Sequence, residues 1–146
     1  MEYPKIGTFH RMDCFTLLHR PVVLLPESPE RINVKYLLFT PTNPIHEEHL
    51  FNENQTSIKK SSFDPKLETK FIVHGFIDDL VIGGWMRQIK DGFLKIGKFN
   101  AIIVDWSQGN EPPYSQATVN TRVVGALIAN LVEDIKVCLN IKITLY

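Results

Sequence analysis

The tripeptide His74-Gly75-Phe76 is the feature of this sequence whose residue types and position best suit chemistry. It follows Phe71-Ile72-Val73, a short apolar run typical of a strand that is buried on both faces. In open α/β sheets ligands bind beyond the carboxyl ends of the strands, where a backbone N–H can stabilise a developing oxyanion. A glycine there lets the chain turn sharply toward such a site. The other interpretation is a strand-end turn with a structural histidine, which the tripeptide by itself favours.

A serine nucleophile on a strand-to-helix turn requires a glycine two residues to either side of it. The nearest approach is Asp105-Trp106-Ser107-Gln108-Gly109, in which Asp105 stands where a glycine is needed. We therefore interpret Ser107 as a loop or capping residue, and Asp105 as an acid that caps a turn or pairs locally. The sequence predicts no catalytic serine within these residues.

The segment His46-Glu47-Glu48-His49 invites a metal-site interpretation. The zinc-peptidase motif needs histidines four apart on a helix, whereas these are three apart and follow Pro41 and Pro44. We expect a solvated loop here. Cys14 and Cys138 are the only cysteines, so neither a paired-cysteine zinc motif nor a disulfide framework is predicted. No metal and no cofactor are expected, and Cys138 is interpreted as a buried or stranded thiol.

Composition narrows the class of protein. The chain has 146 residues, enough for one modest core, and is 44% hydrophobic and 22% charged, as ordinary globular proteins are. Its 16 basic and 16 acidic residues balance without a basic stripe, which disfavours a nucleic-acid partner. No apolar stretch is long enough to cross a bilayer, and the acid and proline in the first five residues are unlike a signal peptide.

Periodicity predicts a βαβ unit in the middle of the chain. The strands are expected at residues 71–73 and 101–104, because both are short apolar runs. Between them, residues 85, 86, 89, 93 and 96 are apolar at three- and four-residue steps, which predicts an amphipathic helix.

The flanking segments are predicted in the same way. Residues 32–39 are expected to form a strand and residues 41–66 mostly a surface loop or irregular strand. Apolar residues every four positions from Val119 to Ile135 predict a long helix with a wide apolar face. The tail 140–146 is a candidate for a further parallel strand.

Four ordered blocks of this sequence resemble the pancreatic-type triacylglycerol lipases. Residues 24–40 look like that family's entry strand, and Lys70-Phe71-Ile72-Val73-His74-Gly75-Phe76 looks like its oxyanion strand and loop. Asn100-Ala101-Ile102-Ile103-Val104-Asp105-Trp106 is similar to its next strand, and residues 114–126 are similar to the helix before its nucleophile strand.

The resemblance implies an α/β fold, the amino-terminal part of an α/β-hydrolase sheet that ends before or at the nucleophile strand. It divides the chain into an amino-terminal segment at 1–13, a partial lipase domain at 14–134, and a tail at 135–146 that departs from the family pattern. It also implies secretion, a lipid substrate or lipid interface, and ester hydrolysis of triacylglycerol or phospholipid by a Ser-Asp-His triad. None of that triad lies in these residues, so we expect this chain to be inactive alone.

One functional residue is carried over from the resemblance. Phe76 matches the position whose backbone amide helps to form the oxyanion hole, and its ring would line the acyl-chain entrance. The family's partner for Cys14 would fall near Thr8, which cannot form a disulfide. A non-catalytic lipid-binding or yolk-protein-like relative is the alternative to an enzyme.

The triplet Asn54-Gln55-Thr56 is an acceptor sequence for N-glycosylation and would suit an extracellular protein. A chain of this length often contains one such triplet by chance, so Asn54 is a possible glycosylation site only.

Overall fold

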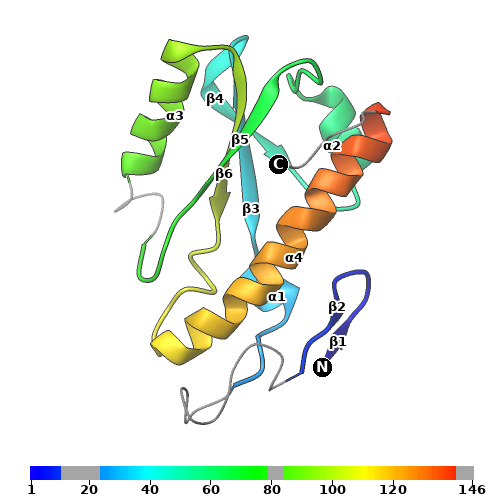
Figure 1. Ribbon diagram of the computed structural model, residues 1–146, viewed down its shortest axis with the longest axis vertical. Coiled ribbons are helices and arrows are strands. Elements are labelled where there is room, and N and C mark those ends of the chain that lie inside the picture. Colours follow the sequence, from blue (N-terminus) through cyan, green and yellow to red (C-terminus); the bar gives the residue numbers. More distant parts are fainter. Residues whose placement is uncertain (11–23, 79–83, 141–146) are drawn as a thin grey trace.

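The computed structural model describes residues 1–10, 24–78 and 84–140 (Figure 1). Strands and helices are interspersed along the chain and form a mixed α/β fold. In chain order the elements are β1 (Glu2–Tyr3), β2 (Gly7–Thr8), α1 (Pro29–Ile32), β3 (Lys35–Thr40), β4 (Asn43–Leu50), α2 (Gln55–Lys60), β5 (Glu68–Val73), α3 (Gly84–Ile96), β6 (Phe99–Asp105) and α4 (Tyr114–Leu139).

The main sheet has four strands in the order β4-β3-β6-β5 and is mixed. β3 is antiparallel to both β4 and β6, while β5 and β6 are parallel with Val73 opposite Val104. Since α3 connects β5 to β6, the predicted βαβ unit is confirmed. The carboxyl ends of two parallel strands therefore lie next to each other, at Val73 and Asp105.

Side chains alternate across the sheet and form two cores, one on each face. One core contains Tyr36, Leu38, Ile102 and Val104 together with the buried face of α4. The other contains Leu37, Phe39, Ile72, Ile103 and Met86 of α3. Figure 1 shows the result, with α3 and α4 on opposite sides of the strands. Because both faces are covered, residues 101–104 of β6 are a continuous apolar run rather than an alternating one.

The first predicted strand begins later than the sequence analysis placed it. Ser28 caps a short helix whose first residue is Pro29, and Asn33 ends that helix in the left-handed conformation at φ 48°. Proline at the first helical position and serine before it are helix-start signals. Ile32 is therefore a fully buried helical residue, and β3 begins at Lys35.

For residues 41–66 the prediction of a surface loop or irregular strand was wrong where a helix forms. Residues 43–50 form the eight-residue strand β4, and residues 55–60 form α2, which Asn54 caps through its side chain. β4 is an edge strand with mostly exposed polar side chains, so its apolar pattern is weak. Its pairing with β3 decides its conformation, and Pro44 is tolerated because it lies in an edge strand.

The long helix was predicted correctly and is longer than expected. α4 has 26 residues, and its buried side chains include Val119, Val123, Leu127, Leu131 and Ile135. The strand proposed for the tail falls mainly on residues 141–146, which lie outside the described residues, as does Cys14.

α3 forms where predicted, but it buries a narrower face than its pattern indicated. Met86 is fully buried and Phe93 is partly buried, whereas Trp85, Ile89 and Ile96 are 38%, 42% and 76% exposed. The described elements therefore leave an apolar stripe on α3 uncovered.

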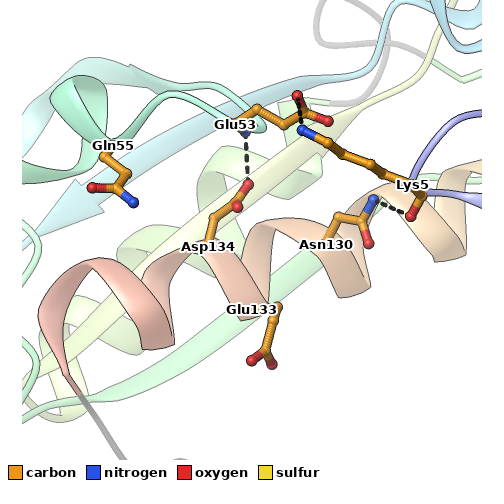
Figure 2. A pocket seen from close by; sticks show the side chains of 6 residues that line it. All are labelled: Lys5, Glu53, Gln55, Asn130, Glu133 and Asp134. Atoms are coloured by element: carbon orange, nitrogen blue, oxygen red, sulfur yellow. Dashed lines mark hydrogen bonds and ion pairs between the residues drawn. The ribbon is translucent and has the colours of Figure 1, made fainter.

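The amino-terminal hairpin β1–β2 is tied to α4 by polar contacts around a pocket of about 320 Å³ (Figure 2). Lys5 Nζ lies 2.7 Å from a carboxylate oxygen of Glu53, and the Asn130 side chain donates to the Lys5 carbonyl. The Glu53 backbone amide donates to Asp134 on α4 at 2.7 Å. These contacts join the hairpin, the segment before α2 and α4. The residues that line this pocket are different from those at the carboxyl ends of β5 and β6.

Candidate functional site

His74 directly follows β5, and Asp105 is the last residue of β6. Because these strands are parallel neighbours, the two residues lie close together. The Nε2 atom of His74 lies 3.4 Å from Oδ1 of Asp105, and both side chains are almost completely buried. The next residue, Trp106, stacks its ring on the His74 ring with centroids 5.6 Å apart. The histidine of the predicted tripeptide is thus part of a buried polar network between the strand ends.

The hydrogen bonds of His74 define its tautomer. The backbone N–H of Trp106 donates to Nε2 at 3.0 Å, so Nε2 is an acceptor. The proton is then on Nδ1, which lies 3.1 Å from the Gly75 carbonyl oxygen and can donate to it. The Trp106 indole N–H donates to the His74 carbonyl at 2.8 Å. With both ring nitrogens occupied by the backbone, His74 holds the turn in shape, as the structural interpretation of the tripeptide expected.

Asp105 is an ionised carboxylate in this network. Burial by itself would raise the pKa of Asp105, but hydrogen bonds from Ser107 and the nearby Lys35 ammonium favour the charged carboxylate. The pKa of Asp105 therefore lies well below the usual value for an aspartate. Its carboxylate accepts from the Ser107 amide at 3.0 Å and pairs with Lys35 at 3.6 Å. Asp105 pairs locally, as predicted.

The turn after His74 has an unusual backbone at Ile77, and not at Gly75 as the sequence suggested. Ile77 has φ of 55°, in the left-handed region that β-branched residues rarely adopt. A Cβ added to Gly75 would meet nothing within 4 Å, and the φ of Gly75 lies outside the left-handed region. The carbonyl of Asn110 accepts from the Ile77 amide at 3.3 Å.

Phe76 lies at the exposed tip of this turn, beyond the carboxyl end of β5. Its ring meets the ring of Tyr114, the first residue of α4, edge to face with centroids 5.0 Å apart. Ile77 and Tyr114 are also exposed, at 57% and 62%. Beside them is an open depression of about 330 Å³, lined by Ile77, Asp78 and parts of the 107–112 loop. A backbone turn and three exposed apolar side chains thus share one end of the sheet.

The remaining predicted residues lie elsewhere or have structural roles. Ser107 is in the turn after β6 and donates its amide to Asp105. His46 and His49 lie on β4 with exposed side chains, and not in a loop as expected. Within residues 1–10, 24–78 and 84–140, no group of three His, Cys, Asp or Glu side chains could hold a metal ion. Cys138 is a half-buried free thiol near the end of α4.

Asn110 is the residue that sequence reasoning missed. It is 2% exposed, and its side chain contacts the backbone of the turn after His74. An asparagine followed by Glu111-Pro112-Pro113 reads as an ordinary loop residue. Since its partners lie 32 and 35 residues earlier, no local pattern identifies them.

Two parallel strands whose carboxyl ends carry a histidine–glycine turn, beside exposed apolar side chains, define an α/β protein with a candidate site at the strand ends. Residues 2–143 match the Lipase family. The chain belongs to the pancreatic lipase family.

Three related proteins show the extent of the similarity. Pancreatic triacylglycerol lipase of Equus caballus is 37% identical over 131 residues, which is 85% of this chain and 28% of that protein. Pancreatic lipase-related protein 2 of Rattus norvegicus is 42% identical over 117 residues, 80% of this chain and 25% of that protein. Inactive pancreatic lipase-related protein 1 of Canis lupus familiaris is 37% identical over 132 residues, 90% of this chain and 28% of that protein. The chain spans about a quarter of the length of these relatives.

No helix among the described residues combines the length and apolar character needed to cross a membrane.

Proposed function

We propose that this chain is the amino-terminal part of an α/β-hydrolase domain, and that the complete protein hydrolyses carboxylic esters of lipids outside the cell. In this proposal the backbone amide of Phe76 is one oxyanion donor. A Ser-Asp-His triad from residues outside this chain supplies the nucleophile. The substrate is triacylglycerol or phospholipid, presented at a lipid interface.

One observation carries the proposal. In a chain of the lipase family, Phe76 lies just beyond the carboxyl end of β5 with its ring against Tyr114, and the next residue, Ile77, lines an open depression. Ligands of open α/β sheets bind at that end of the strands. Exposed aromatic rings beside a backbone donor suit a substrate with an apolar chain and an ester carbonyl, because the rings contact the chain while the donor meets the developing charge.

The experiment compares the complete protein, expressed with a secretion signal, with residues 1–146 alone. We expect the complete protein to hydrolyse emulsified triacylglycerol or phospholipid and to be inactivated by a serine-directed phosphonate. Residues 1–146 should release p-nitrophenol from an ester no faster than an unrelated protein of equal mass, because an oxyanion donor without a nucleophile has no tetrahedral intermediate to stabilise. A folded complete protein without turnover and without phosphonate labelling would contradict the enzyme proposal.

A second candidate function is binding without catalysis. It is favoured by the similarity to a relative whose name states that it is inactive, which is 37% identical over 90% of this chain. The same experiment separates the two candidates. A binding protein would associate with lipid vesicles or emulsion droplets yet remain unlabelled by the phosphonate.

We also propose N-glycosylation at Asn54, which would accompany secretion. Asn54 and Thr56 are exposed at the start of α2, and Asn54 caps that helix by accepting from the Ser57 amide through Oδ1 at 3.1 Å. This cap uses the oxygen, whereas a glycan is attached to the side-chain nitrogen.

The expected result is a band that moves faster on a gel after treatment with an N-glycosidase, once the protein has been secreted from eukaryotic cells. Asn54→Gln and Thr56→Ala should both abolish the shift, and Thr56→Ser should keep it because the acceptor triplet is retained. Secreted wild-type protein with no shift would contradict glycosylation at Asn54 without affecting the enzyme proposal.

A further inference from the structure

We propose that Asn110 is a positioning residue that sets the direction of the Phe76 backbone N–H. It does so by holding the backbone of the turn before Phe76 and after Phe76. The inference rests on the proposed function, because it concerns the oxyanion donor of that site.

Asn110 forms hydrogen bonds with residues before and after Phe76, and these bonds do not use the Phe76 amide. The side-chain nitrogen of Asn110 donates to the Gly75 carbonyl at 2.8 Å and to the Asp78 carbonyl at 2.6 Å. The backbone carbonyl of Asn110 accepts from the Ile77 amide at 3.3 Å. One buried residue thus holds the turn at a point before Phe76 and at two points after it.

The bond to Gly75 has a direct geometric consequence. The Gly75 carbonyl and the Phe76 N–H belong to the same peptide group, which is planar and, when trans, directs the two in opposite directions. Holding the Gly75 oxygen against Asn110 therefore aims the Phe76 N–H away from Asn110. Nδ1 of His74 also lies 3.1 Å from the Gly75 oxygen and supports the same orientation.

The turn needs such support because its backbone is strained. A β-branched residue at a φ of 55°, as at Ile77, costs free energy and persists only where its surroundings hold it. Glycine at position 75 allows the peptide group before Phe76 to rotate easily. Without Asn110, we expect that group to sample orientations in which the Phe76 N–H no longer points toward the substrate side.

The test uses Asn110→Asp in the complete protein. An amide nitrogen carries two hydrogens, and the bonds to Gly75 and Asp78 use both. Aspartate has nearly the same shape but, when ionised, offers only acceptors, so both bonds are lost. We expect kcat to fall about 10- to 100-fold with KM changed less than twofold, since a misplaced donor weakens transition-state stabilisation more than substrate binding.

Asn100→Asp is the matched control. Asn100 is also fully buried and also donates its side-chain amide to loop carbonyls, those of Asp64 at 2.8 Å and Leu67 at 3.3 Å. It lies near the start of β6, whereas Phe76 lies beyond the opposite end of the sheet. We expect a comparable loss of thermal stability in this control, with kcat within twofold of wild type. Equal losses of kcat in both variants would overturn the positioning role.

Hydrogen–deuterium exchange gives a readout that does not depend on activity. Asn110→Asp should speed exchange in residues 75–78 about tenfold or more, and Asn100→Asp should speed it in residues 64–67 instead. If the wild-type protein has no esterase activity, the proposed function fails and this arm alone decides on Asn110. Unchanged exchange in residues 75–78 would overturn the inference. Asn110→Ser shortens the side chain without adding charge, and the same comparison applies to it if the aspartate variant does not fold.

Discussion

Replacing Phe76 with proline is expected to lower the turnover number of the complete protein about 10²–10³-fold, the loss caused by removing one oxyanion donor. Proline has no backbone N–H, so the substitution removes the proposed donor whatever the side chain does. The measurement is kcat on a soluble ester, with circular dichroism to establish that the variant is folded.

Phe76→Ala is the control for the aromatic ring. It keeps the amide and loses the contact with Tyr114, so we expect a rise in KM for long-chain esters with a much smaller loss of kcat. A folded Phe76→Pro variant with wild-type turnover would remove the role assigned to the Phe76 amide.

The second large effect concerns residues 1–146 expressed alone, which we expect to aggregate or to lack a cooperative unfolding transition. In the described sheet β5 is an edge strand, paired only with β6, and Val73 on it is 42% exposed. An open edge with apolar side chains is a template for pairing with another chain. Trp85 and Ile89 on α3 are also uncovered.

The magnitudes support this expectation. Fully burying a large apolar side chain contributes roughly 1.5–3 kcal/mol, and a side chain that stays partly exposed forfeits a corresponding part of that. A domain is stable by only about 5–15 kcal/mol in total. Several such partial losses together are therefore a sizeable fraction of the free energy of unfolding.

Size-exclusion chromatography and thermal unfolding test the expectation. Val73→Lys should increase the monomeric fraction, because a charge on an edge strand opposes pairing. Gln88→Lys adds the same charge at an exposed position of α3 and should have a smaller effect. A wild-type monomer with a single transition above about 50 °C, in the range of ordinary domains, would show that these residues form a stable unit by themselves.

Local sequence patterns were sufficient to predict an element when other elements cover at least one of its faces along its length. The run at Ile102-Ile103-Val104 predicted a buried strand because neither of its faces meets water. The four-residue steps of α4 predicted its buried face, because one side of that helix packs continuously on the sheet. β4 was predicted only as a loop or irregular strand, because an edge strand with exposed polar side chains has backbone pairing but little apolar alternation.

Some features of the candidate site could be predicted from the sequence, and others are visible only in the tertiary structure. The sequence by itself determined that His74-Gly75-Phe76 follows an apolar strand, and its resemblance to the lipases indicated Phe76, because both depend on residues close together in the chain. The expectation that this strand is buried on both faces was wrong, because in the described sheet β5 is an edge strand on which only Ile72 is buried. Only the tertiary structure decided that His74 supports the backbone and that Asn110 holds the turn. It also placed the strain at Ile77 and not at Gly75. Those contacts join residues more than 30 positions apart, and the packing of two parallel strands is what brings them within hydrogen-bond distance.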